Sequence, residues 1–280
     1  MQVIEKKQEL IDLVKNFKKE GKKIGLVPTM GALHEGHISL VEKCVKDNDI
    51  CIASIFVNPT QFNNKKDLDT YPRDIEKDVN NLKSAKCDYI FTPSVEEIYP
   101  EEDTRIFDFG YLDTVMEGAN RPGHFNGVGQ IVSKLFEIIQ PNNAYFGMKD
   151  FQQVAVINKL VEIIKSDVNI VKCPIIREVD GLAKSSRNQL LTDKHRKNAP
   201  HIYATLTKAF KFAPEKSVHE VKEWVINEIN NNPFLEVEYF EIIDDTELTP
   251  VTDWNNNEGI VGCITIQAGN VRLIDNITFK

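Results

Sequence analysis

Two histidines stand three residues apart in the stretch Pro28-Thr29-Met30-Gly31-Ala32-Leu33-His34-Glu35-Gly36-His37. This stretch follows the apolar run 24–27 and precedes residues whose apolar positions recur every three or four places. The pattern predicts that a strand ends, a loop turns and a helix begins at the histidines. A helix N-terminus presents backbone N–H groups and the positive end of the helix dipole. The two side chains lie on one side of the first turn, so the pattern predicts an anion site suited to a nucleotide phosphate, without a Walker lysine.

A simpler interpretation of His34 and His37 is a capping pair on a surface helix. Gly31 and Gly36 favour the nucleotide site, because glycine lets a purine or a phosphate approach the backbone closely. Each glycine alone would also fit an ordinary turn. The preceding strand and the Pro-Thr-Met entry favour the nucleotide site over the capping pair.

A second polar pair, Asn58 and Gln61, lies in Phe56-Val57-Asn58-Pro59-Thr60-Gln61-Phe62, directly after another apolar run. Both side chains are uncharged donors and acceptors. Such groups can bind a hydroxylated carboxylate without neutralising it, which matters if that carboxylate is to act as a nucleophile. The alternative for this pair is a surface turn.

Cations and hydroxyl groups gather in three later segments. Arg121 lies in a glycine-rich stretch with His124 and could pair with an anion, although a structural helix entry fits His124 equally well. Lys149 can reach a phosphate, and Asp150 can accept hydrogen bonds from a ribose or cap a helix. The string 184–187, Lys-Ser-Ser-Arg, resembles an anion clamp, which suits a triphosphate in transfer.

The composition of the whole chain narrows the function classes. The 280 residues are 41% hydrophobic and 27% charged, which is ordinary for a globular protein. The net charge of −8 argues against a dedicated nucleic-acid binder. The five cysteines are widely spaced without a C-x-x-C pair, so we expect reduced thiols and a cytoplasmic location. We find no signal-peptide pattern and no run long enough to span a membrane, so no membrane partner is expected.

The elements that must position these residues alternate along most of the chain. Strands are expected at 23–28, 50–57, 87–92, 105–109, 144–147 and 169–176, with helices at 5–20, 37–47, 72–85, 124–139 and 154–164. This alternation predicts an α/β fold with a Rossmann-like parallel sheet, helices on both faces, and ligands beyond the carboxyl ends of its strands. After about residue 190 the pattern changes to helices at 192–212 and 216–230 and strands at 236–243, 260–266 and 271–274. We therefore expect a domain over 1–180 and a smaller α+β domain over 181–280.

Taken together, these strings closely resemble the pantoate–β-alanine ligases of the H-x-G-H nucleotidyltransferase superfamily. The resemblance is dense over about 20–190 and fits the remaining chain in length and character. The strings that carry it occur in the order of the family: Pro-Thr-Met-Gly-Ala-Leu-His-Glu-Gly-His, Phe-Val-Asn-Pro-Thr-Gln-Phe, Tyr-Pro-Arg, Arg-Pro-Gly-His-Phe, Lys-Asp-x-Gln-Gln and Ser-Ser-Arg-Asn.

The resemblance implies an ATP-dependent ligase that joins D-pantoate to β-alanine in pantothenate biosynthesis, with Mg²⁺. The pantoate carboxylate attacks the α-phosphate and pyrophosphate leaves; the amine of β-alanine then attacks the pantoyl adenylate and AMP leaves. No side chain of the enzyme is acylated, so positioning and charge stabilisation should dominate catalysis. The resemblance also implies a homodimer, and we expect a C-terminal domain that closes over the site; the composition already favours a cytoplasmic location without a nucleic-acid partner.

The same resemblance assigns roles to individual residues. The residues implied to be catalytic are His37, His34, Lys149, Ser185, Ser186 and Arg187. The residues implied to bind ATP are Met30, Gly31, Ala32, Leu33, His34, Glu35, Gly36, His37, Gly147, Met148, Lys149, Asp150, Ile176, Lys184, Ser185, Ser186 and Arg187. Those implied to bind the other substrates are Asn58, Gln61, Gln153 and Arg121. Asp78, in the helix after Tyr71-Pro72-Arg73, is a candidate Mg²⁺ contact, with a solvated helix carboxylate as the alternative.

Two positions depart from the pattern of the family. Gln130 stands where a threonine is common, and Lys184 stands where an apolar residue usually precedes Ser-Ser-Arg. Two rival functions remain open: another H-x-G-H adenylyltransferase that stops at a nucleotide product, and a nucleotide sensor without catalysis. The polar set at 58, 61 and 153 argues against the sensor, because a sensor needs no pocket for an acid.

Overall fold

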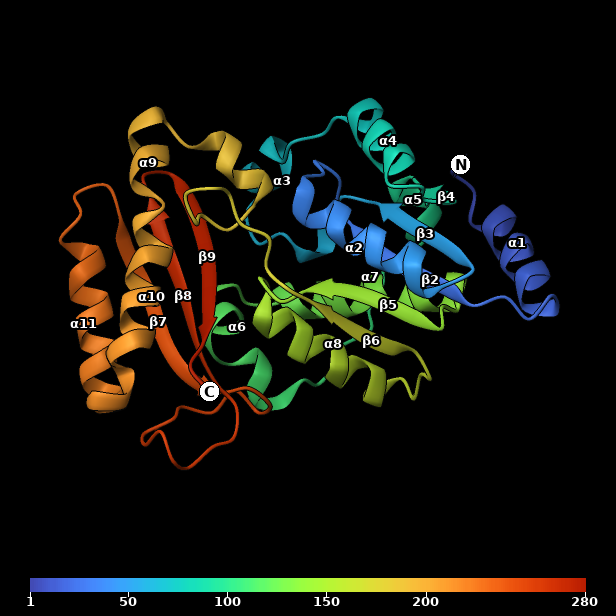
Figure 1. Cartoon of the computed structure of the whole chain (residues 1–280). Coiled ribbons are helices and arrows are strands. Elements are labelled where there is room, and N and C mark those ends of the chain that lie inside the picture. The colour runs from blue at the N-terminus through green and yellow to red at the C-terminus, as the bar shows by residue number, and fades with distance from the viewer. The chain divides into compact units, whose positions relative to one another are not determined.

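The computed structural model describes residues 1–280, which divide into two compact units (Figure 1). The first unit contains Met1–Met148 and Val156–Pro174. The second contains Lys149–Ala155 and Ile175–Lys280. The division falls within helix α8 (Phe151–Ile163), whose first residues belong to the second unit.

A six-stranded parallel sheet forms the centre of the first unit, in the order β1-β4-β3-β2-β5-β6. Neighbouring residues of β2 such as Leu26 and Val27 point to opposite faces, yet both are fully buried. Both faces of the sheet are therefore covered, as the near-continuous apolar runs require. The parallel α/β fold is confirmed. The strands are β1 (Gln2–Ile4), β2 (Ile24–Thr29), β3 (Ile50–Ile55), β4 (Tyr89–Phe91), β5 (Asn143–Gly147) and β6 (Asn169–Cys173).

Helices α2 and α4 contact each other and share a hydrophobic core with the strands. Leu40 and Val41 of α2 and Leu82 of α4 meet Val27 and Ile90 there. Helices α1 and α7 form a second contact, and α7 also contacts β2. The helical segments of this unit are α1 (Lys7–Lys19), α2 (Glu35–Asp47), η1 (Pro59–Gln61), α3 (Lys65–Thr70), α4 (Ile75–Ser84), α5 (Val95–Ile98), η2 (Gly110–Asp113), α6 (Met116–Asn120) and α7 (His124–Ile139).

The strand order reverses beside β2. The chain runs from β2 through β3 to β4 on one side, whereas β5 and β6 lie on the other side. Ligands of open α/β sheets bind beyond the carboxyl ends of the strands at such a reversal. The stretch Met30–His37 follows β2, Asn58 follows β3, and Gly147 ends β5. The fold thus places these predicted site residues at the edge where binding is expected.

The structure corrects two expected elements. Residues 105–109 form no strand, because their backbone groups bond to side chains of α7 rather than to a neighbouring strand. The helix expected over 192–212 is interrupted at Pro200, whose ring nitrogen has no hydrogen to donate. It forms α9 (Asp193–Asn198) and α10 (His201–Phe212).

The second unit is built on a three-stranded antiparallel sheet in the order β7-β8-β9. Ile202 and Leu206 of α10 and Val221 and Val225 of α11 stand four residues apart on their helices, and all four pack in one core with Ile264 of β8. The remaining elements are η3 (Ser186–Leu190), η4 (Ala213–Glu215), α11 (Val218–Asn230), β7 (Glu236–Asp244), β8 (Ile260–Ala268) and β9 (Val271–Thr278). None of the helices of the chain is long and apolar enough to cross a membrane.

Candidate active site

The loop between β2 and α2 is held by the carboxylate of Asp78 from α4. Oδ2 accepts the N–H of Ala32 at 2.8 Å, and Oδ1 accepts the N–H of Leu33 at 2.7 Å. Asp78 is only 2% exposed, and this burial raises the pKa of its carboxyl group, whereas the two N–H bonds oppose the rise. Asp78 is therefore a buried anchor of the loop rather than a solvated helix carboxylate.

Gly31 is required in this loop for two reasons. Its φ of +82° lies in the left-handed region that side chains disfavour. A Cβ at this position would also lie 2.9 Å from Oδ2 of Asp78. The loop thus approaches Asp78 so closely that only glycine fits.

The histidine pair forms a reciprocal cap at the start of α2. Nδ1 of His34 accepts the N–H of Gly36 at 3.1 Å, and Nδ1 of His37 accepts the N–H of His34 at 3.4 Å. The ring centroids are 4.1 Å apart. A neutral imidazole that accepts at Nδ1 carries its proton on Nε2. The capping role is thus present, and it is compatible with a phosphate site because it turns both rings into Nε2–H donors.

Asn58 is the N-cap of the short helix η1 and Gln61 is its last residue, and η1 contacts α7. A Cβ at Gly127 would come within 2.4 Å of the carbonyl oxygen of Thr60, so the contact needs glycine there. Asn58 is 1% exposed and Gln61 8%. Nε2 of Gln61 lies 3.0 Å from Sδ of Met30, which brings the loop after β3 to the loop after β2.

Arg121, which follows α6, and His124, the first residue of α7, support the backbone of η1 at Gln61. Arg121 pairs with Glu117 at 3.5 Å and donates to Nε2 of His124 at 3.1 Å. Because Nε2 then accepts, Nδ1 of His124 carries the proton and donates to the carbonyl oxygen of Gln61 at 2.8 Å. The structure therefore links Arg121 to Gln61 through a histidine, and its direct contact with substrate stays a prediction.

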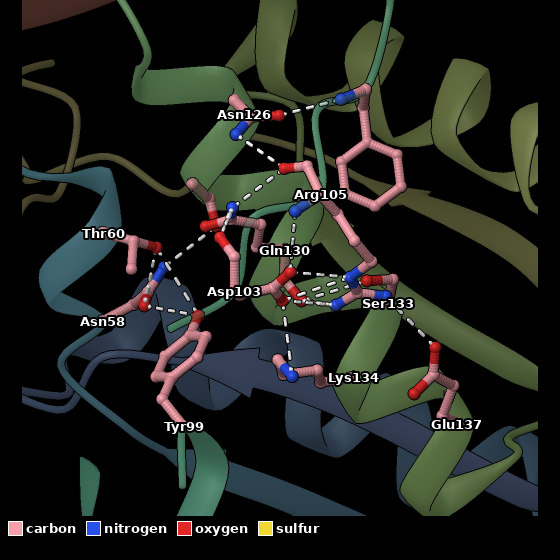
Figure 2. Close-up of polar contacts among 12 residues, drawn as sticks. Asn58, Thr60, Tyr99, Asp103, Arg105, Asn126, Gln130, Ser133, Lys134 and Glu137 are labelled. Atoms are coloured by element: carbon pink, nitrogen blue, oxygen red, sulfur yellow. Dashed lines mark hydrogen bonds and ion pairs between the residues drawn. The ribbon is translucent and has the colours of Figure 1, made fainter. Parts of the chain in front are cut away.

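Sequence reasoning missed a network beside Asn58 that Figure 2 shows. Residues 99–109, which we call the strap, lie along one side of α7, where Asn126, Gln130 and Lys134 stand four residues apart. Nε2 of Gln130 donates to the carbonyl oxygens of Asp103 at 2.7 Å and Arg105 at 3.0 Å. The departure from threonine at position 130 was the one signal of this contact, because a threonine side chain is too short to span both carbonyls.

In the second unit, residues 177–183 form a hairpin that carries the predicted anion clamp. Arg177 and Ala183 form an isolated antiparallel bridge, and the N–H of Lys184 donates to the carbonyl oxygen of Ile176 at 2.9 Å. Nζ of Lys184 lies 3.0 Å from the carboxylate of Glu178. The charge of Lys184 thus has a protein partner, and its contact with phosphate stays a prediction.

The other predicted residues of this unit lie in the two chain segments that compose it, Lys149–Ala155 and Ile175–Lys280. Ser185 caps η3 by accepting the N–H of Arg187 at 3.3 Å, and Ser186 is buried. Lys149 is bound through its carbonyl oxygen by Asn276 of β9 at 3.1 Å. Within α8, Gln152 is buried and Gln153 is half-buried.

The structure contains no cluster of side chains that would enclose a metal ion. No group of three or more His, Cys, Asp or Glu side chains is arranged to hold a metal. Both oxygens of Asp78 already accept hydrogen bonds from the loop. The structure therefore offers no protein-built cage for Mg²⁺, and Asp78 as its contact stays a prediction.

The sequence matches the family model described as pantoate-beta-alanine ligase over residues 2–278. It is 52% identical to a pantothenate synthetase of Porphyromonas gingivalis, with 100% of both chains covered. It is 53% identical to a pantothenate synthetase of Bacteroides fragilis over 100% of this chain and 99% of that one.

Solved structures agree with these relatives. A pantothenate synthetase from Thermus thermophilus has a TM-score of 0.93 at 39% identity, with 100% of this chain and 99% of that chain covered. A pantoate-beta-alanine ligase from Francisella tularensis, complexed with beta-gamma ATP and beta-alanine, has a TM-score of 0.84 at 36% identity, with 100% and 98% covered. The chain belongs to the pantoate–β-alanine ligase family.

Proposed function

We propose that this chain condenses D-pantoate with β-alanine at the expense of ATP, releasing AMP and pyrophosphate through a pantoyl adenylate. The observation that carries the proposal is the pairing of two loops at one sheet edge. One loop presents two imidazole Nε2–H donors and a helix N-terminus, and the other presents neutral amides. Imidazole N–H donors at a helix N-terminus suit a phosphate, and neutral amides suit a carboxylate that must stay nucleophilic.

We assign the nucleotide contacts from the resemblance to the family. Met30 to His37, Gly147 to Asp150, Ile176 and Lys184 to Arg187 bind ATP. His34, His37, Lys149, Ser185, Ser186 and Arg187 stabilise the charge that develops at the α-phosphate and on the leaving pyrophosphate. Preorganised donors of this kind are commonly the largest contribution to transition-state stabilisation. The anchoring of the loop by Asp78 and the reciprocal histidine cap support such preorganisation.

The acid substrate is bound by Gln61 and Gln153. Asn58 acts on it through Gln61, because the amide of Asn58 is buried and bonded within the protein. Arg121 acts through His124 on the backbone of Gln61. Neutral amides leave the carboxylate its negative charge, so it can attack the α-phosphate.

Mg²⁺ enters as part of the substrate Mg·ATP. This ion commonly keeps several waters and binds to substrate phosphates with few protein ligands, which suits a chain without a metal cage. We further propose a cytoplasmic homodimer. All five cysteines are free and buried, which supports a reducing compartment; light scattering of the purified chain tests the dimer.

An omission experiment tests the function. The chain is supplied with pantoate, β-alanine and Mg·ATP, and each is left out in turn. We expect pantothenate, AMP and pyrophosphate in equal amounts only with all three, and pyrophosphate limited to one equivalent per enzyme without β-alanine. Continuous pyrophosphate release without β-alanine would indicate an adenylyltransferase that stops at a nucleotide product. ATP binding without any turnover would indicate a nucleotide sensor.

A further inference from the structure

The side-chain amide of Asn58 has all its hydrogen-bonding positions occupied. Oδ1 accepts the hydroxyl of Tyr99 at 2.9 Å and the hydroxyl of Thr60 at 3.2 Å. Nδ2 donates to the carbonyl oxygen of Gly127 at 3.0 Å and to Oε1 of Gln61 at 3.2 Å. An amide offers two donors and two acceptor positions, so this buried side chain has no bond left for a substrate.

The carbonyl of Gly127 decides which way this amide points. A backbone carbonyl can only accept, so Nδ2 of Asn58 must face it. The other N–H of Nδ2 then points at Gln61, which accepts it with Oε1. Gln61 consequently directs its donor group, Nε2, away from Asn58 and toward Met30. Thioether sulfur is a weak acceptor, and a carboxylate oxygen would be a stronger partner for the same N–H.

Tyr99 supplies the matching donor on the opposite side of Asn58. Its ring is fixed by two neighbours: Nζ of Lys134 lies 5.2 Å from the ring centroid, and the ring of Phe56 lies 6.2 Å away. Lys134 is in turn held 3.3 Å from the carboxylate of Asp103 in the strap. Burial raises the pKa of Tyr99, so its hydroxyl keeps its proton and remains a donor. Figure 2 shows the hydroxyl directed at Asn58 and Thr60.

We infer that Tyr99 is a positioning residue for the acid substrate: its hydroxyl and the carbonyl of Gly127 hold Asn58 in one orientation, so that Gln61 presents Nε2 as a donor to the carboxylate or a hydroxyl of pantoate. The inference deepens the proposed function and rests on it. This series of hydrogen bonds, which we call the relay, runs from the strap to the substrate through Tyr99, Asn58 and Gln61, and each of the three donates toward the substrate. Hydrogen bonds arranged head to tail in this way polarise one another.

The test replaces Tyr99 by Phe, which removes the hydroxyl and keeps the ring. We expect the KM for pantoate to rise about threefold to tenfold, the range for one neutral hydrogen bond, while the KM for ATP stays unchanged. Tyr111→Phe serves as the control, because Tyr111 is an exposed tyrosine and should leave both constants as they are. The double variant Tyr99→Phe/Thr60→Val removes both donors to Oδ1, and its effect should exceed that of Tyr99→Phe alone.

Asn58→Asp tests the direction of the relay. An ionised aspartate can only accept, and a protonated one has a single O–H, which the carbonyl of Gly127 requires; in either case Gln61 must turn Nε2 toward it and present Oε1 to the carboxylate of pantoate. We expect calorimetric affinity for pantoate to fall at least tenfold, with ATP affinity retained. Equal losses for both ligands, or an unchanged pantoate KM in Tyr99→Phe at an unchanged Tm, would overturn the inference. A wild-type chain that makes no pantothenate would refute the proposed function instead, and pantoate binding by calorimetry would still report on the relay.

Discussion

At the scale of single residues, the hydrogen bonds of the histidine rings define what each ring nitrogen can do. In both His34 and His37 the cap uses Nδ1 as an acceptor, which leaves Nε2 as the donor. The same atom therefore could not serve the helix cap and the phosphate. The sequence motif predicted that both histidines lie at the start of the helix. It did not predict which ring nitrogen accepts and which donates, because that depends on the rotamers that the capping box selects.

His37 allows its two roles to be separated. In His37→Asn the amide can still accept the N–H of His34 but cannot reach the Nε2 position, whereas in His37→Gln the amide nitrogen lies near that position. We expect His37→Asn to slow adenylate formation on the order of a hundredfold, the effect of losing one preorganised donor. His37→Gln should retain more of the rate. Rapid-quench measurement of pyrophosphate in a single turnover checks this, and a faster rate in His37→Asn than in His37→Gln would assign the defect to the cap.

At the scale of elements, the strap shows how a chain can be extended without joining a sheet. Arg105, Phe107 and Phe109 are more buried than the residues between them, which is the period-two pattern of a strand. The N–H of Phe107 and the carbonyl oxygen of Arg105 bond instead to the side chain of Asn126. Periodicity predicts the extended backbone correctly but contains no information about its partner, and so the strand expected at 105–109 was wrong.

Gln130→Thr tests how firmly the strap is attached. The variant restores the residue type common in the family but leaves the carbonyl oxygens of Asp103 and Arg105 without the Nε2 donor. We expect a loss of about 1–3 kcal/mol in the free energy of unfolding, the usual cost of removing the partner of a buried polar group. Urea denaturation measures this, with Glu137→Gln as an exposed control on the same helix. A stability equal to that of the wild type would show that the strap does not depend on Gln130.

At the scale of the whole molecule, the sequence predicted the α/β class, the central strands and the loops that carry the site. These features follow from local patterns and from the strings shared with the family. The orientation of Asn58 could not be predicted from the sequence, because it is set by contacts with Gly127 and Tyr99, which lie far from it along the chain. The break at Pro200 was readable in principle, since proline cannot continue the hydrogen bonding of a helix interior.

Acid stability of the folded chain should depend on Asp103. Hydrogen bonds from the Arg105 guanidinium, with the nearby charge of Lys134, lower the pKa of this carboxyl group to about 2. Its pKa in the unfolded chain is near 3.9. A lowered folded pKa means that the ionised group stabilises the fold above the unfolded pKa, and that this contribution is lost as the pH falls through about 2.

Asp103→Asn removes that ionised group, so the wild type should be the more stable of the two at pH 5. The difference should shrink by on the order of 2 kcal/mol as the pH falls toward 2, because protonation then deprives the wild type of the same charge. Urea denaturation at several pH values measures the difference, and Glu137→Gln again serves as the control, since an exposed partner of Arg105 contributes little. A gap between wild type and Asp103→Asn that stays constant from pH 5 to pH 2 would show that the Arg105 and Lys134 contacts do not stabilise the ionised carboxylate. The strap would then be held by Gln130, Asn126 and its aromatic side chains, and the orientation of Tyr99 would rest on packing rather than on charge.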